Sequence, residues 1–155
     1  MCIRDSVYGP GVKANFFAMM RWLDKGLPMP LQGIHNQRSF IALDNLVSLI
    51  VLCIAHPAAA NQILLAADGE DLSTSELLKR LGAALGKPAR LFTVPTAVLR
   101  GVLAVAGMRR AAQRLCGSLQ VDISATRELL GWSPTVTVDE ALRATARHFL
   151  STVRR

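Results

Sequence analysis

The chain has 155 residues, 51% of them hydrophobic and 19% charged, which is enough apolar material for one folded domain and excludes a disordered segment. Its net charge of +7 is spread thinly and only 5% of its residues are aromatic, which argues against a nucleic-acid binder. The apolar runs 46–55 and 97–108 are too short to span a bilayer, which needs roughly 20 apolar residues. We interpret both as buried helices.

The cysteines and the first residues indicate the compartment. The three cysteines are odd in number and lack metal-type spacing, and the first six residues contain no apolar core of a signal peptide. The three histidines lie far apart in no ligand motif, so we interpret them as structural and expect no metal site. These features predict a reduced, cytoplasmic environment.

The amino-terminal third predicts a strand, a turn, a helix and an extended stretch. Residues 7–8 end a short extended piece, and the Gly-Pro-Gly at 9–11 forces a turn. A helix is expected over 14–25, with phenylalanines and other apolar residues on one face and Gly26 after its end. Prolines at 28 and 30 then favour an extended or irregular segment.

The central third predicts a second strand and a very apolar helix. Alternation over 38–42 predicts a strand, and 43–56 predicts a helix that is apolar nearly all round and should therefore be deeply buried. Residues 62–67 are a further strand candidate, closed by Asp-Gly. The Ser-Thr-Ser-Glu at 73–76 is a capping box that should begin a helix ending near Leu85.

The carboxy-terminal third is dominated by helices. Residues 90–94 are expected to be extended, and one or two apolar helices should follow from Pro95 to about 115. Ser124 should cap a short helix that ends at Gly131. A second capping box at 137–140 should begin the last helix, whose inner face includes His148 and Phe149.

Four segments follow one another along the chain: Val-Tyr-Gly-Pro-Gly at 7–11, Asn15, Arg-Ser-Phe-Ile-Ala-Leu-Asp-Asn-Leu at 38–46, and 121–134 with its Leu-Gly-Trp-Ser-Pro ending, followed by Glu140 and Ala141. In order and spacing they resemble the extended short-chain dehydrogenases of the NAD-dependent epimerase/dehydratase family that act on nucleotide sugars. The resemblance implies an α/β fold: the carboxy-terminal part of an extended Rossmann-type dehydrogenase, with a helix-rich substrate domain and a few strands of the cofactor sheet. It covers residues 7–155 and leaves 1–6 as a leader outside the family pattern.

The resemblance also implies a site for a UDP-sugar. The implied substrate-binding residues are Tyr8, Asn15, Pro30, Leu31, Gln32, Arg38 and Arg114. Arg38 and Arg114 would offer guanidinium groups to the diphosphate and Asn15 an amide at a helix start. The main chain of 30–32 would pair with uracil, and Tyr8 would lie near the sugar.

Each of these residues also has a structural interpretation. Arg38 and Arg114 could be solvated surface residues, Asn15 could cap a helix, and Tyr8 could only pack the turn. Asp44 and Asn45 are interpreted as helix-start caps rather than catalytic groups. Trp132 is interpreted as a core anchor.

The family's catalytic signature does not occur in this sequence. The chemistry needs a glycine-rich turn for NAD or NADP, a Ser or Thr, and a Tyr-x-x-x-Lys pair. The single tyrosine, Tyr8, is followed four residues later by Val12, and Gly9 and Gly11 do not begin a Gly-x-Gly-x-x-Gly pattern. We therefore expect no catalytic or cofactor-binding residues here, no bound cofactor and no activity for this chain alone. A cofactor domain that would precede residue 7 is the expected partner.

Three functions stay open on the sequence. The first is the substrate-binding part of a UDP-hexose or UDP-N-acetylhexosamine 4-epimerase, and its variant is a reductase of 4-keto sugar nucleotides. A non-catalytic, dehydrogenase-like binding module is the second, and a nucleic-acid binder is the third and least favoured. Segments 27–31 and 114–122 resemble members that serve bacterial surface polysaccharides. Members of the family often form homodimers, and we extend this expectation to the intact parent protein.

Overall fold

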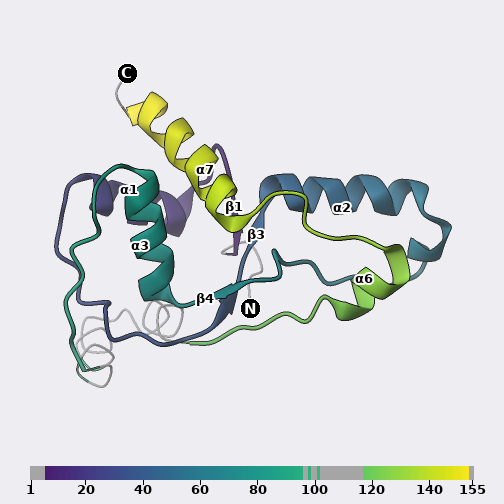
Figure 1. Ribbon diagram of the computed structural model, residues 1–155, viewed down its shortest axis with the longest axis horizontal. Coiled ribbons are helices and arrows are strands. Elements are labelled where there is room, and N and C mark those ends of the chain that lie inside the picture. Colours follow the sequence, from purple (N-terminus) through teal and green to yellow (C-terminus); the bar gives the residue numbers. More distant parts are fainter. Residues whose placement is uncertain (1–5, 96–97, 99–100, 102–116, 154–155) are drawn as a thin grey trace.

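The computed structural model describes residues 6–95, 98, 101 and 117–153, and is rich in helices with few strands (Figure 1). The helices are α1 (Ala14–Asp24), α2 (Leu43–Ala55), the 3₁₀ turn η2 (Pro57–Ala59), α3 (Thr74–Ala84), α6 (Ser124–Leu130) and α7 (Val138–Val153). The strands are β1 (Val7–Tyr8), β2 (Arg38–Ser39), β3 (Ile41–Ala42) and β4 (Asp71–Leu72). The helices predicted over 95–115 lie largely outside the described residues.

The short strands form two separate pairs that meet at Phe40. β1 pairs in parallel with β3, Val7 opposite Ile41, whereas β2 pairs antiparallel with β4, Arg38 opposite Leu72. The strand predicted over 38–42 is therefore present, but it changes partner part-way along its length. β4 therefore pairs with the residues before Phe40, and β1 pairs with the residues after it.

The predicted helix ends are mostly confirmed. The Ser73 hydroxyl accepts a hydrogen bond from the Glu76 amide at 3.1 Å and so caps α3. At α7, the Glu140 carboxylate accepts from the Thr137 amide at 2.9 Å, and the Glu140 amide donates back to the Thr137 hydroxyl at 3.4 Å. Gly131 ends α6 with φ of +61°, a left-handed conformation that glycine adopts at low cost. The prediction for Ser124 is wrong in detail, because Ile123 is the N-cap residue of α6 and the Ser124 amide donates to Asp122.

The buried apolar residues form two clusters. The larger one joins α1, α3 and α7 with β1 and the 29–34 segment, and we call this part the three-helix region. The smaller cluster lies between α2, α6 and the 64–67 segment, and we call it the α2–α6 region. Trp132 is buried in the second cluster and its indole N–H donates to the Ser48 hydroxyl at 3.0 Å, which confirms its interpretation as a core anchor.

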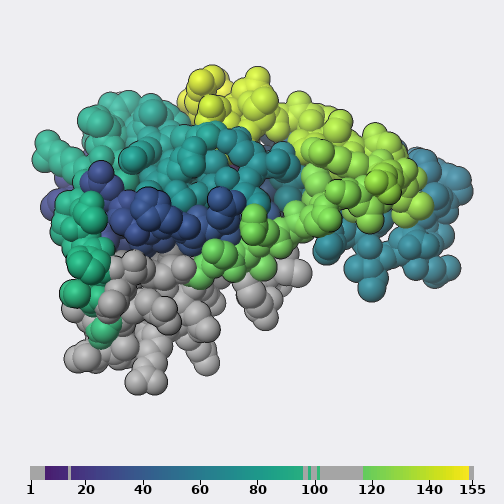
Figure 2. Space-filling model, turned by 60° about the horizontal axis from the view of Figure 1, so that its bottom comes forward, coloured from purple at the N-terminus to yellow at the C-terminus, as the bar shows by residue number. Residues whose placement is uncertain are grey.

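Three expectations about these regions are wrong. The α2 helix is not deeply buried, because only one side packs in its region while Val51 and Ile54 are 59% and 82% exposed. Figure 2 shows α2 and the segment after it, in blue, at one end of the molecule. Residues 62–67 form no strand, since they lack a strand partner among the described residues and Ile63 is 95% exposed. His148 is exposed to solvent and is not part of the buried face of α7, while Ala146 takes a buried position.

Within the ranges that the structure describes, no helix has both the length and the apolar composition needed to cross a membrane.

Candidate nucleotide-binding site

Tyr8 lies at the centre of the molecule and holds several elements together. Its side chain is 1% exposed, and its hydroxyl donates to the Asp68 carboxylate at 2.8 Å. Its ring stacks on Phe16 at 5.5 Å between centroids and meets the Phe40 ring edge-on at 6.4 Å. Burial, together with the Asp68 charge, raises the pKa of Tyr8 far above its usual value, so the phenol stays protonated. The structure therefore gives Tyr8 a packing role, and contact with a ligand stays a prediction.

Asp68 and Asn45 form a polar cluster that sequence reasoning missed. The Asp68 carboxylate accepts from the Tyr8 hydroxyl, from the Ala42 amide at 2.9 Å and from the Asn45 side-chain amide at 2.7 Å. Asn45 is 0% exposed; its amide also donates to the Val136 carbonyl, and its oxygen accepts from the Val136 amide, both at 2.9 Å. Asn45 is thus a buried link between α2 and the segment before α7, and it is not a helix cap. No local pattern signals this, because the partners lie 23 and 91 residues away.

Arg38 lies in β2, half-buried, at a junction of three segments. β4 flanks it on one side, and on the other the Leu119 carbonyl accepts from the Ser39 amide at 2.8 Å. The Arg38 guanidinium carbon lies 5.8 Å from the Phe40 ring centroid, within range of a cation–π contact. A guanidinium stacked on a ring face keeps its in-plane N–H groups directed outward, which suits an anionic partner.

Asn15 lies in the first turn of α1 and is exposed to solvent. The N-cap residue is Lys13, whose side chain makes no capping hydrogen bond, so the interpretation of Asn15 as a cap is not supported. The next residue, Phe16, stacks on Tyr8, and Tyr8 contacts Phe40. A column of three rings therefore connects the first turn of α1 to the guanidinium of Arg38.

The main chain of 30–32 is already engaged within the protein. The Leu31 amide donates to the Met29 carbonyl at 2.9 Å and the Gln32 amide to the Phe92 carbonyl at 3.3 Å. The carbonyls of Leu31 and Gln32 both accept from the Ser75 hydroxyl. A pyrimidine edge that bound here would compete with the longer of these contacts, between Gln32 and Phe92. Pairing with uracil by Pro30, Leu31 and Gln32 stays a prediction.

Comparison with known proteins identifies the family. No family model matches the sequence. A curated UDP-glucose 4-epimerase of Vibrio cholerae is 48% identical over 145 residues, which is 93% of this chain and 44% of that protein. Over this alignment the chain resembles an extended short-chain dehydrogenase. It spans less than half the length of this relative and corresponds to the carboxy-terminal half of the family fold.

Solved structures agree on the fold of this chain. It resembles a UDP-glucuronic acid 4-epimerase from Bacillus cereus in complex with NAD (TM-score 0.68, 18% identity, 96% of this chain and 42% of that one). The UDP-glucose 4-epimerase from Thermotoga maritima with UDP-glucose is similar (TM-score 0.66, 20% identity, 96% and 44%). RMD from Pseudomonas aeruginosa complexed with NADPH matches equally well (TM-score 0.68, 16% identity, 95% and 46%). The fold is therefore the carboxy-terminal part of a Rossmann-type dehydrogenase.

Arg114, the remaining candidate of this dehydrogenase chain, lies outside the described residues. The segment that follows it in sequence is described and runs beside β2. There the Gly117 carbonyl accepts from the Asn36 side chain at 3.0 Å, and the Ser118 hydroxyl accepts from the Gln37 amide at 3.1 Å. The structure thus brings 117–121 to the Arg38 junction, while a contact by Arg114 itself stays a prediction.

The residues of this chain do not fit the family's nicotinamide cofactor. Its one tyrosine is buried against a carboxylate, not paired with a lysine four residues later, and no glycine-rich dinucleotide pattern occurs in the sequence. Burial, and then the Asp68 charge, raise the pKa of Tyr8, which is the opposite of what an easily ionised acid–base group of the reaction needs. In the described ranges, no group of three or more His, Cys, Asp and Glu side chains could hold a metal ion either.

Proposed function

We propose that this chain forms the nucleotide-sugar-binding part of a nicotinamide-dependent sugar 4-epimerase that acts on a UDP-hexose or UDP-N-acetylhexosamine. The observation that carries the proposal is the 48% identity to a UDP-glucose 4-epimerase along 93% of the chain. The similar folds of epimerases solved with NAD and with UDP-glucose support it.

The proposed grip on the substrate uses the two ends of the aromatic column. A pyrophosphate carries about two negative charges, which suit a guanidinium fork and the N-terminus of a helix. Arg38 supplies the fork from β2, and the first turn of α1 supplies backbone N–H groups beside the Asn15 amide. Three contacts separate these two groups: Arg38 to Phe40 at 5.8 Å, Phe40 to Tyr8 at 6.4 Å and Tyr8 to Phe16 at 5.5 Å. The rings are packed in a dense core that resists displacement, so Arg38 would hold the pyrophosphate while the first turn of α1 contacts another part of the extended nucleotide sugar.

The exposed face of α2 supports the presence of a second, cofactor-binding part. Its large side chains Leu43, Val47, Ile50 and Ile54 recur at spacings of four, three and four residues, which places them on one stripe of the helix. A contiguous apolar stripe of this kind marks a protein interface. We propose that the cofactor-binding part of the intact protein covers it and supplies the catalytic tyrosine and lysine.

A titration of UDP against the intact polypeptide that carries this sequence tests the binding site. Arg38→Ala should weaken UDP binding about tenfold or more, since hydrogen bonds to charged groups contribute about 1.5–3 kcal/mol. Arg38→Lys should weaken it less, because the charge remains but the fork is lost. The matched control is Arg147→Ala, an exposed arginine of α7, which should leave the affinity unchanged. Equal affinities for the Arg38 and Arg147 variants would remove Arg38 from the site.

Assays with cofactor separate the alternatives that the sequence left open. A 4-epimerase interconverts UDP-glucose and UDP-galactose without net consumption of NAD, because the hydride is returned. A reductase of 4-keto sugar nucleotides would instead consume reduced cofactor stoichiometrically. If the intact protein bound UDP but catalysed neither conversion, the non-catalytic binding module would replace our proposal.

A further inference from the structure

A cavity lies between the amino-terminal half of α1 and the carboxy-terminal half of α7, and Arg38 does not line it. Its volume is about 370 Å³, within the range of small-molecule sites. It is lined by Gly11, Val12, Lys13, Phe17, Met20, Thr145, His148, Phe149 and Thr152. Neither Arg38 nor Asn15 belongs to this lining, although Lys13 and Phe17 come from the same turn of α1 as Asn15.

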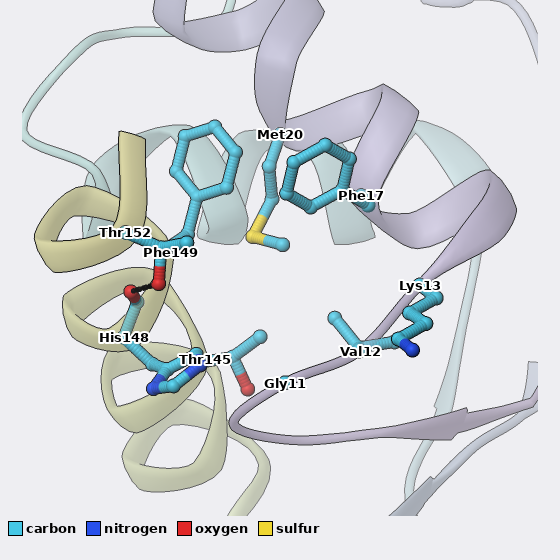
Figure 3. Close-up of a pocket in the computed structure, with 9 residues that line it drawn as sticks. All are labelled: Gly11, Val12, Lys13, Phe17, Met20, Thr145, His148, Phe149 and Thr152. Atoms are coloured by element: carbon cyan, nitrogen blue, oxygen red, sulfur yellow. Dashed lines mark hydrogen bonds between the residues drawn. The ribbon is translucent and has the colours of Figure 1, made fainter. Parts of the chain in front are cut away.

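One side of the cavity is aromatic and apolar. The Phe17 and Phe149 rings meet edge-to-face at 5.3 Å between centroids and 68° between planes, and Met20 lies beside them (Figure 3). Aromatic rings favour offset or edge contacts with a further ring, and a thioether also packs well against one. This side therefore suits a flat aromatic group better than a polar one.

The opposite side carries the polar and basic groups. Figure 3 shows His148 and Thr145 from α7 and the 11–13 loop facing the rings across the cavity. Lys13 and His148 are both exposed, and the described lining contains no Asp or Glu. Thr145 is buried and donates its hydroxyl to the Ala141 carbonyl at 2.7 Å, so the oxygen can still accept a hydrogen bond.

Gly11 keeps the polar side open. Its φ of +81° is a left-handed conformation that disfavours other residues. A Cβ at this position would lie 4.0 Å from the His148 Nε2 atom, at van der Waals contact. The absence of a side chain at Gly11 thus leaves the cavity open beside His148.

From this arrangement we infer a binding site for a small aromatic carboxylate. The ring would pack among Phe17, Met20 and Phe149, and the carboxylate would lie against Lys13 and His148. Charge complementarity decides the class of ligand, because basic groups border the cavity without an acidic counterpart in its described lining. The inference does not depend on the proposed sugar chemistry.

The test uses 3-phenylpropionate and the methionine methyl groups of the intact polypeptide. In a ¹³C-methyl NMR titration, the Met20 signal should move in a saturable way, since the ring current of the ligand acts on it. Met29, buried outside the cavity, is the internal reference and should stay in place. A non-saturating drift that is equal for Met20 and Met29 would overturn the site.

Two comparisons then test the chemistry of recognition. 3-Phenylpropanol has the same ring without the charge and should bind more weakly, and propionate, which lacks the ring, should leave Met20 unmoved. Lys13→Gln should weaken 3-phenylpropionate about threefold, the size typical of an exposed ion pair, whereas Lys25→Gln at the other end of α1 should not. Equal binding of the alcohol and the acid, or equal effects of the two lysine variants, would refute the assigned ligand class.

A cavity-filling variant tests whether this site is independent of the nucleotide site. Val12→Phe should abolish the Met20 response and leave UDP binding intact, while Arg38→Ala should do the reverse. Loss of UDP binding in Val12→Phe would mean that the cavity is part of the nucleotide site and would overturn the inference of a second one.

Discussion

The three-helix region and the α2–α6 region contain similar side chains but bury them to very different extents. Leu78 and Leu81 of α3 are 0% exposed, while α2, the most apolar of the described helices, has Val51 and Ile54 on its open face. In the first region, three helices and a strand enclose the apolar side chains from all directions. In the second, α6 and an irregular segment cover α2 from one side only. The apolar content of a helix therefore predicts that it has neighbours, but does not identify them.

The largest expected difference between the two regions is in how much the loss of one apolar side chain lowers the free energy of unfolding. Leu78→Ala removes a fully enclosed side chain from the three-helix region, and the resulting cavity should cost about 2–5 kcal/mol in the free energy of unfolding. In the 155-residue polypeptide on its own, Ile54→Ala on the open face of α2 should cost less than about 0.5 kcal/mol. Urea denaturation of both variants measures the contrast. Similar losses would show that α2 is covered in solution, for example by a second copy of the chain.

Asn45 connects the two regions, so its removal should uncouple them. Asn45→Ala removes a fully buried side chain whose oxygen accepts hydrogen bonds from the amides of Thr135 and Val136, which should cost about 1–3 kcal/mol. Asp44→Ala, the exposed neighbour in the same helical turn, is the matched control and should cost well under half as much. Fluorescence of Trp132 in the α2–α6 region and of Trp22 on α1 should report different denaturation midpoints in Asn45→Ala. Coincident midpoints would show that other contacts suffice to couple the regions.

The smallest expected effect is a pH-dependent contribution from the α7 cap. The Thr137 hydroxyl and amide donate to the Glu140 carboxylate and hold its pKa below the usual 4.5. Because the folded-state pKa is the lower one, this contribution is present above about pH 4.5 and is lost as the pH falls through the folded value. Glu140→Gln should therefore melt slightly below the wild type at pH 7 and together with it at pH 3. A difference that persisted at pH 3 would assign it to helix propensity and not to the carboxylate.

The sequence predicted local features well and long-range ones poorly. The caps at Ser73 and Thr137 depend on side chains that act on backbone groups within four residues, and α1 ends just before the left-handed Gly26, so a local pattern contains the information. The Asn45–Asp68 contact and the partner exchange at Phe40 depend on segments that meet only in the folded chain. The strand expected at 62–67 failed for the same reason, because an apolar run cannot form a strand without a neighbouring backbone to pair with.

The candidate site shows the same difference between local features, which the sequence predicts, and long-range contacts, which it does not. Family resemblance selected Arg38 and Asn15, and the structure adds the ring column that connects them. No spacing rule relates Phe16, Tyr8 and Phe40, which come from a helix, a strand and a residue between strands. The packing role of Tyr8 was only one of two open interpretations in the sequence, since a lone tyrosine before a turn can serve either purpose.

The position of the Asp68 carboxylate has a consequence for the order in which the chain folds. Helix α3 carries its own cap at Ser73, so it can nucleate from a contiguous stretch of polypeptide. The amide that precedes α2, in contrast, is satisfied by a residue 26 positions further along, after the helix itself has been completed. Stabilising the first turn of α2 must therefore await closure of that loop, and substitutions at Asp68 should accelerate unfolding more than they slow folding.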